Sequence, residues 1–377
     1  MRKIILTIHL FLSLTLGLFI VVTCTTGSLV LIEPDVEKLL YPIGQKPSPG
    51  DVGPAAIQQR ADALHPDFKT SLIEWPDRDG FYHVHLEKDG KDERVVYADP
   101  GTGAVFGQVA EDRREPFATI YNLHRYFLLT TVIGKQNAAS FVGLLGGGLL
   151  LILATGIYLW WPGIKKMALG FRIVRSRGRL MHNMSLHKTI GIISIPVLLL
   201  ASLTGLLNAF EKSIPGWVGF NAREEIPKSA MQSARADTVL PVDRIVDIVR
   251  KSHPDSRPIR IQLPQKPGDT YQVGLREGFG TSDRINSTIY LDASNGEVRY
   301  KTNPNLAINL YNTWRKDLHF AVWGGLTVQL ITFAFGMMPL VLMVTGLVIW
   351  RLKARARKRS GKQQRSQQLQ RQESSAI

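Results

Sequence analysis

The chain has 377 residues, of which 45% are hydrophobic and 20% are charged, and its formal net charge is +15. These totals would suit a soluble protein, but the apolar residues are concentrated in four long blocks, which excludes an ordinary soluble domain. The single cysteine, Cys24, excludes a disulfide framework. A basic chain can bind nucleic acid, but the Lys and Arg residues follow the ends of the apolar blocks, so no nucleic-acid partner is expected.

The apolar blocks predict four transmembrane helices, at residues 4–32, 141–161, 189–210 and 326–350. Each reaches the length of about 20 apolar residues that a helix needs to cross a bilayer. The first block is interpreted as a retained helix rather than a cleaved signal peptide. Its apolar run is too long for a signal, and Val21-Val22-Thr23 is a poor cleavage site.

The distribution of basic residues predicts the orientation of these helices. Lys and Arg cluster before the first block, in the loop 163–186 and in the tail 353–377, where Glu373 is the single acid. Because basic flanks remain in the cytoplasm, both termini and the loop are expected there. The long segments between the helices then lie outside, in the periplasm of a bacterial inner membrane. The Gln- and Arg-rich tail from Ser360 is expected to be disordered.

The first and third helices match at an offset of 178 residues. His9 precedes a Thr-Gly pair by 17 and 18 residues and Glu33 by 24, and His187 precedes a second Thr-Gly pair and Glu211 at the same spacings. The second and fourth helices end in the related pairs Thr155-Gly156 and Thr345-Gly346. Each follows a Leu-His pair, which contains His124 or His319. The chain is therefore interpreted as a duplication.

The external segments carry the same duplication. The pattern Tyr97-x-Asp99-x-x-x-Gly103-x-Val105 recurs at residues 290–298, and it predicts a strand, a turn and a strand. Each segment is therefore expected to form a small α+β domain. The fold class is membrane α-helical, with four transmembrane helices in two parallel repeats, each with an external α+β domain.

This organisation gives domain boundaries along the chain. They are helix 1 at 1–33, the first external domain at 34–117, an interfacial segment with helix 2 at 118–162, the basic loop at 163–186, helix 3 at 187–211, the second external domain at 212–314, helix 4 at 315–352 and the tail at 353–377.

Four histidines form two pairs under the duplication. His9 and His187 are expected near the cytoplasmic face, and His124 and His319 near the external face. Two imidazoles that face each other at one depth suit the two axial positions of a haem iron. Such ligation leaves no open iron position, which favours electron transfer. His9 and Gly27 are 18 residues apart, or five helical turns, so a small residue on the same face would leave room for a macrocycle.

Other roles for histidines remain open at this stage. One histidine at a helix end can simply sit at the membrane interface, although four paired ones favour ligation. Zinc is the main competing metal, but each pair offers two nitrogens where zinc sites use three or four ligands. His182 is either an alternative ligand or a surface residue. His83-x-His85 suggests a metal clip, but the second copy lacks both histidines, which favours a solvated strand.

Two glutamates also correspond under the duplication. Glu33 and Glu211 sit where helices 1 and 3 leave the membrane. They suit either a cationic or metal-bearing substrate or ordinary polar helix ends, and the second interpretation is favoured.

With these features in view, residues 1–355 resemble the PepSY-associated transmembrane family, often called iron-regulated membrane proteins. The resemblance rests on the Leu-His pairs, the His-to-Thr-Gly helices and the two Tyr-x-Asp-x-x-x-Gly-x-Val units. It is similar in particular to ferric-siderophore reductases, which implies two haem b groups with His9, His124, His187 and His319 as ligands of the haem iron. It also implies that iron in a ferric siderophore is reduced on the periplasmic side.

The internal segments are too short for a nucleotide or flavin domain. The expected electron donor is therefore quinol or a separate cytoplasmic reductase. The alternative function is a haem-free PepSY binding or regulatory module for a siderophore, a peptide or a peptidase. The paired histidines distinguish the two functions, because the alternative needs no haem ligands.

Overall fold

The computed structural model describes residues 1–40, 46–76, 79–88, 92–109, 115–235, 237–277 and 286–374. The chain divides into two compact units. The helical unit comprises Met1–Leu29, Asn122–Ala209 and Ile331–Ile377, and the sheet unit comprises Val30–Tyr121 and Phe210–Leu330. Each unit is considered below by itself.

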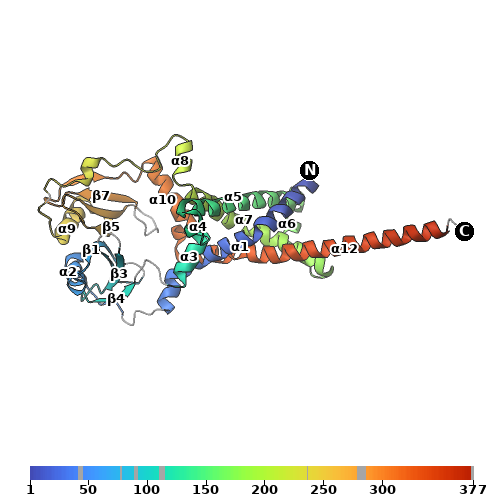
Figure 1. Ribbon diagram of the computed structural model, residues 1–377, viewed down its shortest axis with the longest axis horizontal. Helices are drawn as coiled ribbons and strands as arrows, with labels where there is room; N and C mark the ends of the chain where they lie inside the picture. Colours follow the sequence, from blue (N-terminus) through green and yellow to red (C-terminus); the bar gives the residue numbers. More distant parts are fainter. Residues whose placement is uncertain are drawn as a thin grey trace. The chain divides into compact units, whose positions relative to one another are not determined.

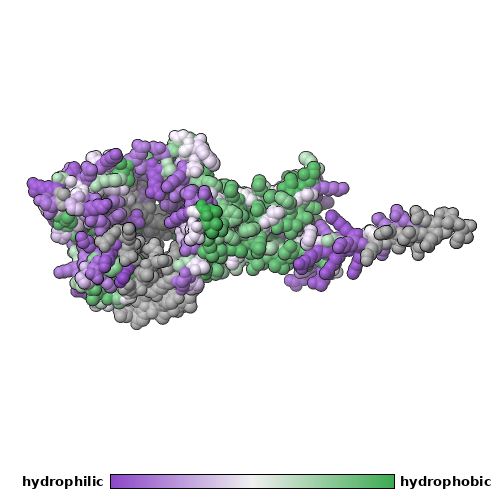
Figure 2. Space-filling model, in the orientation of Figure 1, coloured by the Kyte–Doolittle hydropathy of each residue, from purple (hydrophilic) through white to green (hydrophobic). Residues whose placement is uncertain are grey.

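Four helical stretches are long and apolar enough to cross a membrane, at Arg2–Val36, Lys135–Trp160, Gly178–Ala209 and Val322–Gly361. They confirm the four predicted apolar blocks. The first lies in α1 (Arg2–Leu40), and the second and third are α5 (Lys135–Trp160) and α7 (Gly178–Ala209). The fourth contains η3 (Val322–Gly324), α11 (Gly325–Gly336) and α12 (Met338–Ser374). Hydrophobic side chains dominate the surface of these helices in Figure 2, as lipid contact requires.

Close helix packing forms the core of the helical unit. Helix α7 contacts both α5 and α12, which run beside it in Figure 1. The core contains Ile20, Leu145, Leu149, Leu153 and Leu198. A Cβ atom added at Gly146 would lie 3.2 Å from the carbonyl oxygen of Ser202, so a small residue lets the backbones of α5 and α7 approach.

Shorter helices connect the long ones. In the first half of the chain they are α3 (Phe117–Tyr126), α4 (Thr130–Ile133), η1 (Ile164–Lys166) and α6 (Met167–Gly170). In the second half they are α8 (Ser213–Trp217), η2 (Lys228–Met231) and α10 (Ala307–His319).

The sheet unit is built on one antiparallel sheet of eight strands, in the order β4-β3-β2-β1-β5-β6-β7-β8. The first four strands are β1 (Lys69–Glu74), β2 (Tyr82–Lys88), β3 (Asp92–Ala98) and β4 (Val105–Val109). The last four are β5 (Ser256–Gln262), β6 (Tyr271–Glu277), β7 (Ser287–Leu291) and β8 (Val298–Lys301). Helices α2 (Pro54–Leu64) and α9 (Val242–Ser252) precede the two sets of strands and pack on β1 and β5.

Strand alternation produces the core beneath these two helices. Tyr82, Val84 and Leu86 of β2 are fully buried, as are Val273 and Leu275 of β6. Their alternation along the chain gives each strand one apolar face, and that face packs against Ile57 of α2 and Ile245 of α9 in a single core. The expected helix-plus-strands segments are therefore present in both halves.

The two halves share one sheet, which differs from the expectation of two separate external domains. Strands β1 and β5 pair antiparallel, with Ile73 opposite Ile261 and Glu74 opposite Arg260. Each half ends in an edge strand with unpaired backbone groups, and pairing the two edges satisfies them. The union brings residues of β1 beside residues of β5, far apart in sequence.

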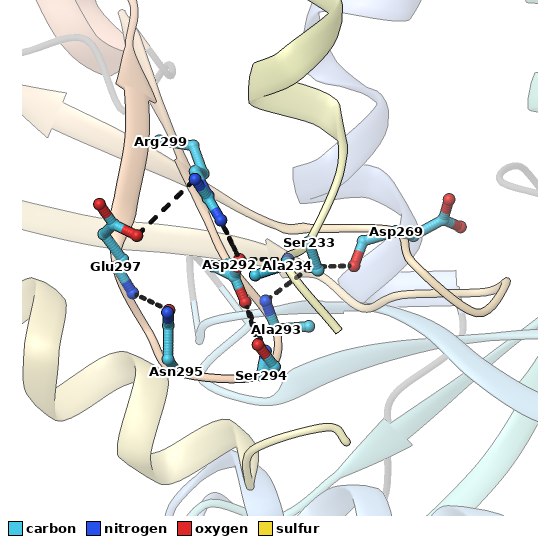
Figure 3. Close-up of polar contacts among 9 residues, drawn as sticks. All are labelled: Ser233, Ala234, Asp269, Asp292, Ala293, Ser294, Asn295, Glu297 and Arg299. Atoms are coloured by element: carbon cyan, nitrogen blue, oxygen red, sulfur yellow. Dashed lines mark hydrogen bonds and ion pairs between the residues drawn. The ribbon is translucent and has the colours of Figure 1, made fainter. Parts of the chain in front are cut away.

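The duplicated Tyr-x-Asp pattern forms the predicted turns, and a buried carboxylate holds each one. Asp292 accepts hydrogen bonds from the backbone N–H groups of Ala234 (2.6 Å) and Ser294 (2.8 Å) and from Arg299 (2.6 Å), as Figure 3 shows. Asp99 accepts from the backbone N–H groups of Ser48 (2.8 Å) and Thr102 (2.7 Å). Each carboxylate thereby ties a preceding loop to its turn.

The glycines of this pattern have left-handed backbones, with φ of 66° at Gly103 and 77° at Gly296. Their N–H groups donate to the carbonyl oxygens of Asp99 and Asp292, respectively. A side chain would strain this conformation, which explains glycine at both turns.

The C-terminal segment differs from the expected disordered tail. Helix α12 continues through Ser374, and residues 375–377 lie outside the described part of the chain. Lys, Arg and Gln dominate the extension and have favourable helix propensities, so the segment prolongs the preceding helix.

The Asp99 turn predicts a pH-dependent contribution to stability. Burial alone would raise the pKa of Asp99, but hydrogen bonds from Ser48 and Thr102 outweigh it and lower that pKa to about 2. The contribution is therefore complete above the ordinary carboxyl pKa and is lost as pH falls through about 2. We expect Asp99→Asn to lower the free energy of unfolding by about 1–3 kcal/mol at pH 7.

Thermal unfolding of the full chain in detergent, followed by tryptophan fluorescence from pH 7 downward, measures this effect. The exposed Asp255 supplies the matched control, Asp255→Asn. Equal melting temperatures for the two variants at pH 7 would show that the Asp99 carboxylate does not hold the turn.

Candidate functional site

His9 and His187 make equivalent contacts in the helical unit. Nδ1 of His9 on α1 lies 2.9 Å from Oγ1 of Thr155 on α5. Nδ1 of His187 on α7 lies 2.9 Å from Oγ1 of Thr345 on α12. Each member of the predicted pair is thus held by the next long helix along the chain.

The threonine hydroxyls link each imidazole to the backbone of the next helix. The Thr155 hydroxyl is 2.9 Å from the carbonyl oxygen of Leu151, and the Thr345 hydroxyl is 2.8 Å from that of Val341. A hydroxyl has one hydrogen, so a threonine that donates it to this carbonyl accepts from Nδ1–H of the imidazole. Nε2 of both histidines is then the unprotonated nitrogen, which is the form that ligates a metal.

The glycines after these threonines pack against the same rings. A Cβ atom added at Gly156 would lie 3.5 Å from Cε1 of His9, and one added at Gly346 would lie 3.5 Å from Cε1 of His187. Each Thr-Gly pair therefore has two roles. The threonine contacts the imidazole nitrogen, and the glycine lies against the ring.

His124 is held in a comparable way at the end of α3. Its Nδ1 lies 2.9 Å from the carbonyl oxygen of Thr23 on α1. A carbonyl only accepts, so Nδ1–H donates and Nε2 carries the lone pair. Burial lowers the pKa of His124, and nearby Arg125 lowers it further, although the bond to Thr23 opposes them. The imidazole is therefore neutral at pH 7, as metal ligation requires.

Gly27 packs directly on His124. A Cβ atom added at Gly27 would lie 2.6 Å from Cε1 of the ring, which is too close for any side chain. Sequence analysis assigned Gly27 to the same site as His9, because the two share a helix face. The structure instead gives His9 its close glycine from α5 and pairs Gly27 with His124.

His319 is the last residue of α10 in the sheet unit. Its ring meets Phe320 edge-on, with 5.5 Å between ring centroids. His124 belongs to the helical unit, so these two predicted partners come from different units. Arg315 and Lys316 lie about one helical turn before His319 on the same helix.

The remaining candidate histidines have structural partners. Nδ1 of His182 lies 3.2 Å from the carbonyl oxygen of Val174, which ties the preceding loop to α7. Nε2 of His83 lies 2.5 Å from Asp79, and Nε2 of His85 lies 3.7 Å from Glu74. Among the described residues no three His, Cys, Asp or Glu side chains are grouped to hold a metal ion. These contacts favour structural roles over a metal clip.

A cavity of about 700 Å³ lies in the sheet unit. Its walls come from β1, β5, β6, β7 and α10 and from residues 222–226. Glu211 contributes to the lining, and its carboxylate pairs with Arg315 at 3.2 Å. Glu211, a candidate for binding a cationic substrate, is thus paired with a cation of the protein itself. Glu33 is buried in the same unit, with 6% of its surface exposed.

Sequence analysis did not identify the basic wall of this cavity. Arg257 and Arg260 on β5 and Arg276 on β6 line it. The sequence does show arginines concentrated in strands where apolar residues otherwise alternate. This pattern could not predict the basic wall, because it does not reveal which face of the strands meets α10.

These features define a multi-pass membrane protein with an α+β domain. They are the four apolar helices of membrane length, the hydrogen-bonded histidines and the antiparallel sheet with its cavity. The chain belongs to the family of the PepSY-associated TM region, whose model matches residues 6–353. No curated protein matches the chain in sequence.

Close packing at Gly27 generates a testable prediction. Gly27→Ala forces the His124 ring to move, and overpacking of this kind costs about 1–3 kcal/mol. Gly147→Ala is the matched control, because its Cβ would make an ordinary contact at 3.9 Å with Leu206. We expect a lower melting temperature in detergent for Gly27→Ala alone. A loss of the same size in both variants would contradict the contact between Gly27 and His124.

Proposed function

We propose that this protein is a di-haem electron-transfer protein of the bacterial inner membrane. One haem b is held between His9 and His187, and a second between His124 and His319. The observation that carries the proposal is a contact shared by His9, His124 and His187: Nδ1 of each lies 2.9 Å from an oxygen of another helix. With Nδ1–H as the donor in this contact, Nε2 is the nitrogen that can coordinate a metal.

The surroundings of these imidazoles fit haem better than the competing roles. A histidine that only sits at the membrane interface has no need of a fixed tautomer or of a glycine against its ring. Zinc needs three or four protein ligands, and each pair supplies two nitrogens. Haem, which two imidazoles can hold, would use this donor set of two nitrogens per pair.

The protein residues hold and tune the cofactor, while bound haem supplies reversible one-electron chemistry. Thr155 and Thr345 accept neutral hydrogen bonds from the imidazoles, so His9 and His187 stay neutral ligands of fixed orientation. The apolar helices exclude water from this region. Burial in this region of low dielectric would also influence the reduction potential of a bound haem.

The basic residues that flank the helices are the basis for the proposed direction of electron transfer. They favour a cytoplasmic location for both termini and for the ends of the helices that carry His9 and His187, and a periplasmic location for the sheet unit. Electrons would enter at the cytoplasmic end from quinol or from a cytoplasmic reductase. They would leave to iron in a ferric siderophore bound at the sheet unit. Reduction releases the iron because hard oxygen ligands hold the more highly charged ion more tightly.

A second candidate function is a haem-free binding or regulatory module for a siderophore, a peptide or a peptidase. The cavity of about 700 Å³ in the sheet unit favours it, since a ligand site needs no redox centre. This function predicts a protein without haem and full tolerance of His124→Ala.

Haem stoichiometry distinguishes the two functions. We expect protein purified in detergent from haem-replete cells to contain two low-spin b-type haems per chain, measured by reduced-minus-oxidised spectra and pyridine haemochrome. His187→Ala and His124→Ala should each remove one haem, because each deletes an axial ligand. His182→Ala is the matched control and should retain both. A haem-free protein, or haem content unaffected by the first two variants, would overturn the proposal.

The threonine contacts predict a graded effect. Thr155→Val keeps the shape but removes the acceptor for His9 Nδ1–H, and loss of such a partner weakens metal binding about 10–100-fold. Thr155→Ser restores the hydroxyl and should restore retention. Transfer of haem from the reduced protein to apomyoglobin measures the loss rate. Identical rates for the valine and serine variants would show that the hydroxyl does not support the ligand.

A further inference from the structure

The cavity in the sheet unit has a predominantly basic lining. Seven basic side chains line it against four acidic ones. The basic residues are Lys212, Arg223, Arg257, Arg260, Arg276, Arg315 and Lys316, and the acidic ones are Glu74, Glu211, Glu224 and Asp317. Such a concave basic wall concentrates anions from solution.

Internal contacts occupy three of the acids. Glu211 pairs with Arg315 at 3.2 Å. Glu224 accepts from the Tyr300 hydroxyl at 2.7 Å and from the Asn309 amide. Glu74 lies 3.7 Å from Nε2 of His85. The carboxylates keep their negative charge in these contacts, so the described lining has an excess of three basic over acidic side chains.

Several arginines of the wall are not neutralised in this way. Within the described part of the chain, Arg223, Arg257 and Arg260 form no ion pair with a carboxylate. Arg257 on β5 is also directly opposite Arg276 on β6 in the strand register. Arg257 and Arg260 are exposed to solvent on this strand, so their guanidinium groups are accessible to a ligand.

From this lining we propose that the cavity binds an anionic, carboxylate-bearing iron(III) chelate through Arg257, Arg260 and Arg223. The planar guanidinium fork matches a carboxylate with two parallel hydrogen bonds, and it carries its charge at every physiological pH. The volume of about 700 Å³ suits a compact metal complex. Complexes built from citrate-like hydroxycarboxylates are anionic, whereas three monohydroxamates around iron(III) give a neutral complex.

The identification of the ligand as an iron(III) chelate rests on the proposed redox function. The position of the cavity connects the two. Helix α10 contributes Asn312, Thr313 and Lys316 to the wall and ends at His319. His319 follows Lys316 by three residues, or a rise of about 4.5 Å along the helix. A chelate in the cavity therefore lies against the helix that supplies a proposed haem ligand.

Gallium(III) complexes test the proposal with the full chain in detergent, because they copy iron(III) but are not reduced. Isothermal titration compares the anionic gallium dicitrate with neutral gallium tris(acetohydroxamate). We expect the anionic complex to bind at least about tenfold more tightly, with an affinity that falls as salt rises. In the double variant Arg257→Gln/Arg260→Gln that affinity should fall about tenfold or more.

Arg244→Gln is the matched control, since Arg244 is exposed on α9 and does not line the cavity. Equal binding of the two complexes, or equal affinity in the double variant and the control, would overturn the proposal. Binding of citrate alone as tightly as gallium dicitrate would also overturn the chelate assignment. Haem content in the same preparation reports separately on the proposed redox function, because gallium binding needs no haem.

Discussion

The hydrogen bond from an imidazole Nδ1–H to an oxygen of another helix is the constraint on which the account of this protein depends. It joins α1 to α5 through His9 and Thr155, and α7 to α12 through His187 and Thr345. A buried imidazole needs such a partner, because an unpaired donor in an apolar bundle is costly. With Nδ1–H as the donor, the lone pair is on Nε2, the nitrogen through which the proposed haem iron would be bound.

The sheet unit depends on a second non-local contact, the pairing of β1 with β5. This pairing turns two helix-plus-strands segments into one sheet and aligns Glu74 with Arg260. It also brings Trp75 from the first half of the chain to a cavity whose arginines come from the second. The cavity is therefore a product of the joined sheet, and neither half alone supplies its whole lining.

Local patterns allowed much of this structure to be predicted from the sequence. Long apolar runs identified the membrane-length helices, and the repeated Tyr-x-Asp pattern identified the turns that follow β3 and β7. Contacts between distant segments were harder to predict, because helix periodicity places Gly27 on the face of His9 without showing that His124 packs there. Likewise, the strand pattern of residues 256–262 does not show that Arg257 and Arg260 face a cavity. Those features depend on how α3, β1 and α10 meet other elements.

The central claim is that pairs of histidines ligate haem iron through Nε2. Near-infrared magnetic circular dichroism of the oxidised, detergent-purified protein tests it most directly, because the energy of the low-spin ferric charge-transfer band identifies the two axial ligands. The account predicts that every haem in the chain gives the band of two neutral imidazoles. A band from histidine with methionine, a high-spin signal from one open position, or the absence of haem would contradict it.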